Sequence, residues 1–282
     1  MCVRPSCVIV YACVSYARAH VVVQVTVACG GHHTVAVTEE GQVVSWGWGN
    51  DGQLGHGDTY DQTLPTRVQA LAGQRVTDVA CGYYHTAAVN EDGAVMCWGK
   101  GSSGQLGLRD RGAALLPRML TGLHAHRIRR VACGMAHTLA LSDEGEVFAW
   151  GSGADGQLGV GQREPEQVDA EEPVKVQGLP TDAPVTVIAA GSRHSLCISG
   201  DDGQLFVWGN NADGRLGFAD EGGEWVNRLV PTTPAPFDVA RASGVAGGGA
   251  FSLVVDENGL VYTAGKGRWV AWHPLQAAAG VW

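Results

Sequence analysis

The chain has 282 residues, of which 41 are glycine, 45% are hydrophobic and only 17% are charged. A formal net charge of −9 argues against the basic surface with which proteins bind the phosphates of nucleic acids. The glycine content is typical of turn-rich, all-β structure.

The first 20 residues belong to no repeat. They contain Arg4, an apolar run from Cys7 to Val14 and the sequence Ala17-Arg18-Ala19, which together resemble a short secretory signal peptide. The apolar run is too short to cross a bilayer as a helix. The preferred interpretation is a β-rich remnant of a preceding blade or a misplaced start codon, because free cysteines in the repeats argue against an oxidising destination.

A repeated frame follows, beginning with VACGGHHTVAVTEEGQVVSWGWGNDGQLG at residues 27–55. The same frame returns at 79–107, 131–159 and 188–217, and a degenerate fifth copy begins at residue 245. The glycine of the opening tetrapeptide marks the copies at Gly30, Gly82, Gly134, Gly191 and Gly248, in steps of 52, 52, 57 and 57 residues. A period of this length indicates a repeat architecture.

Each copy has the pattern of a β-hairpin. In the third copy, residues 137–141 predict a strand, Gly145 a tight turn and residues 147–150 a second strand, which a glycine-rich segment ends. The pattern contains no helical period. Two strands cannot bury a face alone, so neighbouring units must stack, as in a propeller or a solenoid.

The pattern V-A-C-G-x-x-H-T, G-x-V-x-x-W-G and G-Q-L-G resembles the repeat of the regulator of chromosome condensation family over about residues 24–266. Four copies keep one histidine and one tryptophan at fixed places: His33, His85, His137 and His194, and Trp46, Trp98, Trp150 and Trp208. The resemblance implies an all-β fold, a β-propeller that normally has seven blades of four antiparallel strands.

Only five frames are present, so we predict an incomplete ring or open arc of about five blades over residues 21–267, followed by a divergent C-terminal tail at 268–282. Such an arc would expose strand edges that are otherwise paired. Completion of the ring by the terminal segments or by another chain is the alternative.

No constellation of residues predicts catalysis. The three G-x-G-x-x-G segments at 47–52, 99–104 and 151–156 lie in an all-β repeat, where they indicate tight turns rather than a dinucleotide site. Adjacent His194 and Ser195 would point to opposite faces of a strand. We expect each repeat histidine to be buried and hydrogen-bonded to backbone or to a neighbouring hydroxyl. The prediction is therefore no enzyme, no metal and no cofactor.

The eight cysteines include no C-x-x-C pair, which argues against zinc. Cys29, Cys81 and Cys133 occupy one repeat position, where later copies have Ala190 and Gly247. This position is predicted to be a small, tightly packed core site. Free core cysteines favour a reducing compartment, so we expect a cytoplasmic or nuclear protein.

The repeat tryptophans are predicted to fill the core. A light-sensing member of the family carries tryptophans directly after the repeat glycine. The matching positions here hold no tryptophan, so photoreception by that mechanism is not expected; they are Gly31, Tyr83, Met135, Ser192 and Gly249.

Two connections are longer than the frame requires. The first, at 163–173, is acidic and resembles a mobile loop, and the second, at 220–228, places a tryptophan among polar residues. We hypothesise that they form an acidic patch that recruits a basic partner surface, with the tryptophan as its anchor. A solvated loop without a partner is the alternative. The residues of this hypothesis are Glu164, Glu166, Asp169, Glu171, Glu172, Glu221, Glu224 and Trp225.

The predicted function is a non-enzymatic scaffold that binds a protein partner through its loops. The resemblance implies two kinds of partner, a ubiquitin-pathway component, as for the propellers of HECT-type ubiquitin ligases, or a small GTPase. Guanine-nucleotide exchange on a Ran-like GTPase is the alternative function, although no motif here maps onto the exchange loop. Neither direct nucleic-acid binding nor a membrane span is expected.

Overall fold

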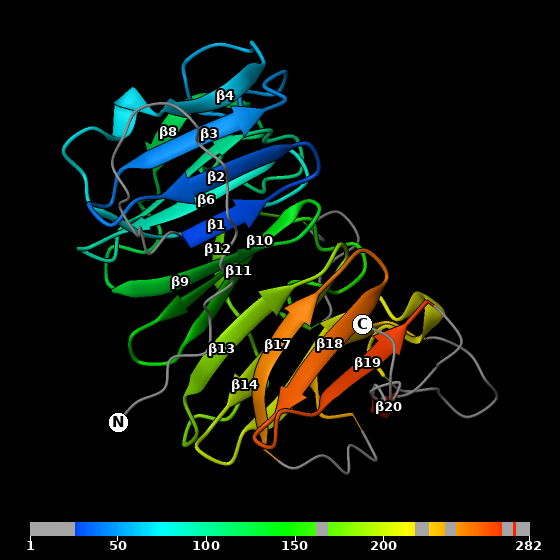
Figure 1. Cartoon of the computed structure of the whole chain (residues 1–282). Helices are drawn as coiled ribbons and strands as arrows, with labels where there is room; N and C mark the ends of the chain where they lie inside the picture. The colour runs from blue at the N-terminus through cyan, green and yellow to red at the C-terminus, as the bar shows by residue number, and fades with distance from the viewer. Residues whose placement is uncertain (1–25, 162–168, 218–225, 235–240, 267–272, 275–282) are drawn as a thin grey trace.

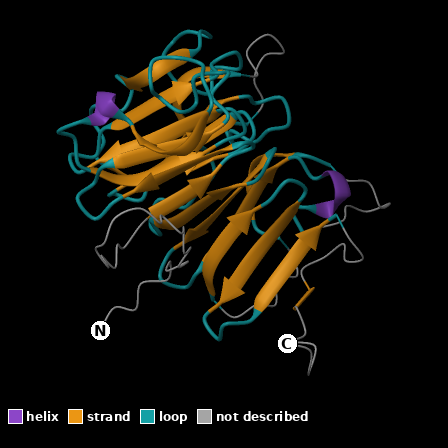
Figure 2. Ribbon diagram, turned by 45° about the horizontal axis from the view of Figure 1, so that its top comes forward, coloured by secondary structure: helices purple, strands orange, loops and turns teal. Residues whose placement is uncertain are grey.

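The computed structural model describes residues 26–161, 169–217, 226–234, 241–266 and 273–274. In this part of the chain, the strands form five sheets of four, and each sheet takes its strands in chain order. All pairings within the sheets are antiparallel. Figure 1 shows the five sheets as a fan in which each is one blade, and Figure 2 shows that strands and loops make up almost the whole molecule.

The blades are defined by these strands. Blade 1 has β1 (Thr26–Cys29), β2 (His33–Val37), β3 (Val43–Gly47) and β4 (Gln62–Arg67). Blade 2 has β5 (Val76–Cys81), β6 (His85–Asn90), β7 (Val95–Gly99) and β8 (Ala114–Met119). Blade 3 has β9 (Ile128–Cys133), β10 (His137–Ser142), β11 (Val147–Gly151) and β12 (Ala170–Lys175).

Blade 4 has β13 (Val185–Ala190), β14 (His194–Ser199), β15 (Gln204–Gly209) and β16 (Arg228–Thr232). Blade 5 has β17 (Ala242–Gly247), β18 (Phe251–Asp256), β19 (Val261–Gly265) and β20 (His273–Pro274). Two 3-10 turns, η1 (Gln69–Leu71) and η2 (Ala212–Gly214), are the helical elements of the described residues. The fold class, an all-β propeller of five recognisable four-stranded blades, is therefore confirmed.

The local sequence explains the hairpins. Between β10 and β11, Gly145 has φ +81°, a backbone conformation that other residues rarely adopt, and its N–H donates to the Ser142 carbonyl. A side chain at Gly145 would also overlap Pro184 of the next connection. The turn therefore requires glycine for both its conformation and its close packing.

The blades pack face against face, and the core lies between them. The innermost strands β1, β5, β9, β13 and β17 contact one another in succession. Three of the four repeat tryptophans, Trp98, Trp150 and Trp208, are completely buried at these junctions, which confirms the prediction that they fill the core. Trp46 of blade 1 is only half-buried, because the described residues provide no blade in front of it.

Blades 1 and 5 lie at opposite ends of the arc (Figure 1). The open end at blade 1 exposes the face of a sheet. The prediction of an exposed strand edge was therefore wrong for this end. Each blade has the same two edge strands, its innermost and its outermost, wherever it lies in the arc. We call this surface the leading face of blade 1. It consists of Val27, Cys29, Thr34, Val44 and Trp46, all of them at least partly exposed.

The expectation of a core site at Cys29 was wrong for this copy, because Cys29 is exposed on the leading face. The equivalent Cys81 is buried and Cys133 is partly buried, as expected. The five cysteines among the described residues, Cys29, Cys81, Cys97, Cys133 and Cys197, are all free.

Two segments differ from their predicted roles. The acidic segment at 163–173 was expected to be a loop, but its last residues begin β12, the outermost strand of blade 3. An outermost strand accepts charged side chains and the proline at Pro173 because one of its edges is unpaired. At the other end of the chain, β20 lies within the expected tail and pairs with β19, so blade 5 extends past residue 267. Among the described residues, no helix is long and apolar enough to cross a membrane.

Candidate functional site

The repeat histidines form the junctions between blades. Each imidazole is buried and hydrogen-bonded, as predicted, and of the two predicted kinds of partner it has the hydroxyl, which lies on the second strand of the next blade. The Nε2–Oγ distances are 2.9 Å for His33–Thr86, 2.9 Å for His85–Thr138, 3.0 Å for His137–Ser195 and 2.9 Å for His194–Ser252. The histidines therefore connect neighbouring blades and do not converge on a common centre.

Each hydroxyl in turn donates a hydrogen bond to a backbone carbonyl of the blade that supplied the imidazole. Thr86 Oγ1 donates to the Gln53 carbonyl over 2.9 Å, in the Gly-Gln-Leu-Gly turn of blade 1. Trp98 Nε1 donates to the same carbonyl, also over 2.9 Å. The same pattern recurs in the next two junctions, from Thr138 and Trp150 to Gln105 and from Ser195 and Trp208 to Gln157.

This network assigns the imidazole tautomer. Because the Thr86 hydroxyl donates its proton to Gln53, it accepts from His33, which places the imidazole proton on Nε2. Nδ1 is buried and has no hydrogen-bond partner in all four histidines. Burial lowers the pKa to about 4 in His33 and His137 and to about 3 in His85 and His194. These neutral, enclosed rings are structural groups and not accessible bases.

The core cysteines are equally unsuited to nucleophilic chemistry. Burial raises the pKa of Cys133 to about 12 and also raises the pKa of Cys81, Cys97 and Cys197 well above the ordinary value. A buried thiol with a raised pKa is almost entirely protonated at neutral pH. Neither the histidines nor the buried cysteines of the described residues thus form a catalytic site.

An exposed aromatic cluster lies at one end of blades 1 and 2, where loops join their strands. We call His32, Trp48, Tyr83 and Tyr84 the aromatic cluster. The ring centroids are 5.0 Å apart for His32–Trp48, 5.6 Å for His32–Tyr83, 5.9 Å for Trp48–Tyr84 and 4.6 Å for Tyr83–Tyr84, all edge to face. Tyr83 is 39% exposed.

Backbone hydrogen bonds fix the loops that carry these rings. Trp48 N–H donates to the His32 carbonyl, and Lys100 N–H donates to the Tyr84 carbonyl, each over 2.9 Å. The Lys100 ammonium lies 4.9 Å from the centroid of the Tyr84 ring. Next to Tyr83, in blade 3, Met135 is also exposed and accepts a hydrogen bond from the Tyr83 N–H. The cluster is therefore a preorganised aromatic surface with a cationic margin.

Sequence reasoning missed this surface. Its residues come from three loops of two blades, and only the stacking of the blades brings them together. The available indication was the Tyr83-Tyr84 pair after the repeat glycine, where the first copy has Gly31-His32 and the third has Met135-Ala136. A position packed in the core of every blade would not vary so widely in size among the copies.

The acidic residues of the first predicted binding segment are paired within the chain as far as they are described. Arg111 binds Asp169 at 3.4 Å and Glu171 at 2.7 Å, and Arg109 binds Glu172 at 2.8 Å. These ion pairs join a loop of blade 2 to blade 3. Five members of the predicted patch lie outside the described residues, Glu164, Glu166, Glu221, Glu224 and Trp225.

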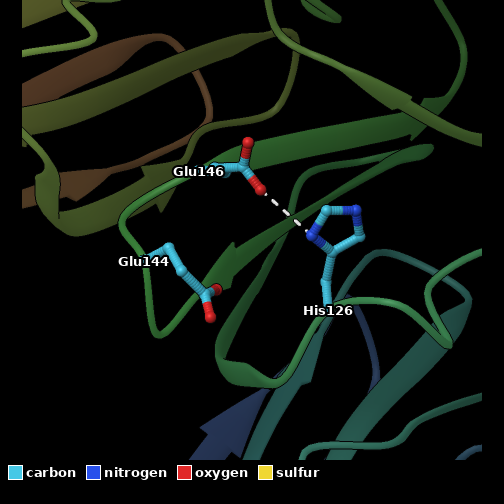
Figure 3. A group of neighbouring side chains, drawn as sticks. All are labelled: His126, Glu144 and Glu146. Carbon is cyan, nitrogen blue, oxygen red and sulfur yellow. Dashed lines mark ion pairs between the residues drawn. The ribbon is translucent and has the colours of Figure 1, made fainter.

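A polar cluster lies at the turn between β10 and β11 of blade 3, beside the connection that carries His126 (Figure 3). Ligand atoms of His126, Glu144 and Glu146 lie within 4.8 Å of one another, and His126 faces Glu146 with Nδ1 3.0 Å from the carboxylate. The Lys175 ammonium binds the other Glu146 oxygen at 2.5 Å. The hydrogen bond from Lys175 and the charge of that ammonium hold the pKa of Glu146 below its usual value. A cation would compete with Lys175, so the arrangement is an ion-pair network.

Comparison with known proteins gives consistent matches. Residues 7–271 match the protein family described as the RCC1-like domain. The chain is 36% identical over 248 residues to the ultraviolet-B receptor UVR8 of Arabidopsis thaliana, an alignment that covers 86% of this chain and 53% of UVR8. It is 37% identical over 248 residues to human E3 ubiquitin-protein ligase HERC2, covering 87% of this chain and 5% of HERC2.

Among solved structures, the crystal structure of human WBSCR16 superposes with a TM-score of 0.78 at 26% identity, covering 89% of this chain and 66% of that one. The chain spans about half the length of UVR8 and a small part of HERC2.

Proposed function

The chain belongs to the RCC1-like domain family, and from this premise we propose that it is a non-enzymatic scaffold that binds a protein partner through the aromatic cluster. The observation that carries the proposal is the contrast between two sets of polar and aromatic residues. The repeat histidines and three of the repeat tryptophans are enclosed in blade junctions, whereas the aromatic cluster is open at the end of two blades.

The composition of the cluster suits protein recognition. Tyrosine, tryptophan and methionine are enriched at protein interfaces and dominate their binding energy. The rings are held by neighbouring rings and backbone hydrogen bonds, so little side-chain freedom would be lost on binding. The related proteins UVR8 and HERC2 are a receptor and a ubiquitin ligase, so a ubiquitin-pathway component is one class of partner consistent with the proposal.

The acidic patch at 163–173 and 220–228 stays a separate prediction. The ion pairs of Glu171 and Glu172 with Arg111 and Arg109 reduce the charge that this segment can offer to a basic partner. The aromatic cluster is for this reason the better-supported binding surface. The acidic segments would at most increase the rate of association with a basic partner, in a way that depends on salt.

The test is quantitative affinity capture from cell extract with the double variant Trp48→Ala, Tyr83→Ala. We expect specific partners to be lost at least tenfold, since an aromatic hot-spot residue commonly contributes about 2 kcal/mol or more to binding. The matched control is Tyr60→Ala, because Tyr60 is 74% exposed and lies outside the cluster. Equal capture by the wild type, the double variant and the control, with unchanged melting temperatures, would reject the cluster as the binding surface.

Guanine-nucleotide exchange on a Ran-like small GTPase is the alternative function. It differs from scaffolding in kinetics, because an exchange factor turns over and accelerates nucleotide release at sub-stoichiometric amounts. The two functions can therefore be separated without knowing the natural partner.

A further inference from the structure

One loop of blade 2 holds an arginine in a strained backbone conformation. Arg109 has φ +62°, in the left-handed region that residues other than glycine occupy at a cost. The equivalent loops of blades 1 and 3 have glycine at this position, Gly57 with φ +92° and Gly161 with φ +75°. Among the described residues, the one other non-glycine residue with positive φ is Asp213, and aspartate tolerates this conformation through short local hydrogen bonds. The arginine has no such compensation.

The backbone contact of this loop does not need the arginine side chain. In each of the three loops, the N–H of this residue donates to a carbonyl on the outermost strand of the next blade. The N–O distances are 3.0 Å for Gly57–Leu115, 2.9 Å for Arg109–Glu171 and 3.1 Å for Gly161–Leu229. Glycine therefore makes the connection as well as arginine does.

The ion pair of Arg109 does not account for the arginine either. Its Nε donates to Glu172 Oε2 over 2.8 Å, but the two side chains are 69% and 52% exposed, and exposed ion pairs contribute little to stability. Arg111 already joins the same loop to β12 through Asp169 and Glu171. Backbone strain that stability does not explain is typical of functional positions.

The terminal edge of the Arg109 guanidinium is available to a ligand. The bond to Glu172 uses Nε, and no described residue accepts a hydrogen bond from either Nη atom. This planar edge can donate two parallel hydrogen bonds to a carboxylate. One guanidinium can hold two carboxylates, as Arg111 does with Asp169 and Glu171. Glu172 thus orients the Arg109 side chain and leaves its terminal edge for a second carboxylate.

The loop that carries Arg109 is continuous with the aromatic cluster. A side chain at Gly101 would overlap the Gly112 carbonyl, so the two ends of the β7–β8 connection touch. Gly101 follows Lys100, whose ammonium lies 4.9 Å from the centroid of the Tyr84 ring and pairs with no carboxylate of the described residues. The same end of blade 2 therefore carries aromatic rings, an ammonium and a guanidinium.

We propose that Arg109 binds an aspartate or glutamate side chain of the protein partner that occupies the aromatic cluster, an inference that rests on the proposed function. The partner places an apolar side chain on the rings and an acidic one over the β7–β8 connection, where a basic side chain would be repelled by Lys100 and Arg109. At this point the partner is opposite in charge to the basic surface expected for the acidic segments.

The first test separates the backbone strain from the side chain. Arg109→Ala removes the side chain and keeps the strain, whereas Arg109→Gly removes both. In urea unfolding, we expect the folding equilibrium constant of Arg109→Gly to be about threefold or more above that of Arg109→Ala, and no lower than about a third of the wild-type value. A larger loss in Arg109→Gly would show that the arginine serves the fold, and would overturn the proposal.

The second test measures binding with a random-peptide phage library selected on the full chain. Peptides that lose binding to the double variant Trp48→Ala, Tyr83→Ala are kept, because they occupy the cluster. We expect them to share an acidic residue. Its replacement with the corresponding amide should weaken binding to the wild type about tenfold, but binding to Arg109→Gly by less than about twofold.

Arg118→Ala is the matched control. Arg118 is a second exposed arginine of blade 2, paired with Asp110, and it lies on β8 outside the loop. The acidic residue of the peptide should keep its tenfold effect in this variant. An equal loss of that effect in Arg118→Ala and Arg109→Gly would mean that general charge, and not Arg109, attracts the peptide.

The selection also distinguishes this inference from the proposed function. Peptides that depend on the cluster but have no acidic residue coupled to Arg109 would overturn the inference and leave the proposed function intact. A library that yields no peptide dependent on Trp48 and Tyr83 would count against both.

Discussion

One histidine in each blade junction joins two neighbouring blades through a hydrogen bond. His85 donates to Thr138 of the next blade, and no proton acceptor or donor meets its Nδ1. Protonation would add a charge and an N–H to a site that can satisfy neither, which is why its pKa falls to about 3. The repeat histidines therefore make the fold sensitive to acid.

Stability should fall as the pH drops below about 6.5. An unfolded histidine has a pKa near 6.5, so between that value and the lowered folded values of about 3 to 4 the unfolded state binds more protons. Each histidine then costs about 1.4 kcal/mol of stability for each pH unit. Urea unfolding at pH 7.5, 6.5 and 5.5 measures this loss, which precedes the titration of most carboxylates.

The variant His85→Gln isolates one of these protons. It should lower the free energy of unfolding at pH 7.5. It should also reduce the loss of stability between pH 6.5 and 5.5 by the contribution of one histidine, at most about 1.4 kcal/mol. A stability that is flat over this range in the wild type would show that the buried imidazoles do not titrate as described.

The repeat tryptophans should differ according to their place in the arc. Trp98 and Trp150 are completely buried, so replacing either with alanine should destabilise the chain by about 3–5 kcal/mol through lost burial and a cavity. Trp46→Ala should cost clearly less, because Trp46 is half-buried. Chemical denaturation of the three variants measures the difference, and equal losses would show that the leading face of blade 1 is covered.

At the scale of the element, neighbouring blades are joined by a buried contact between two strands and by exposed ion pairs from a loop. Asp78 of β5 is buried and accepts from the Val131 N–H of β9 over 2.9 Å and from Arg130 over 3.0 Å. Arg111 makes its ion pairs with Asp169 and Glu171 on the surface. The buried contact should contribute far more.

We expect Asp78→Ala to destabilise the chain by about 2–3 kcal/mol, because it leaves the Val131 N–H buried without an acceptor. Arg111→Ala should change stability by less than about 1 kcal/mol, as is usual for exposed ion pairs. Thermal unfolding of both variants at the same pH provides the comparison. Similar losses in the two would contradict the assignment of Asp78 as the stronger connection.

The elements also show what the sequence could and could not predict. Strand pairs, hairpin glycines and the burial of the repeat histidines follow from a local pattern repeated every 52 or 57 residues. The choice of a hydroxyl on the next blade as the histidine's partner does not, because it depends on how the blades stack. The outermost strands were harder to predict. For example, β12 is acidic and contains Pro173, and both features are also typical of loops. The aromatic cluster was beyond prediction, since Trp48 and Tyr83 meet only through the packing of two blades.

At the scale of the whole molecule, five blades form an arc with an exposed face at one end. The leading face of blade 1 contains Val27, Val44 and Trp46, and exposed apolar faces promote association. The isolated chain should therefore have low solubility despite its net charge of −9. Light scattering over a concentration series tests this, and a compact, highly soluble monomer would contradict an open arc.

The central claim is that this chain binds a partner without catalysing a reaction on it. The most direct measurement is the release of labelled GDP from a panel of small GTPases, Ran-like members included, with the chain present at sub-stoichiometric amounts. The scaffold proposal predicts that every GTPase releases nucleotide at its spontaneous rate, including any that the chain binds. Accelerated, catalytic release from any one of them would contradict the proposal and make the chain an exchange factor.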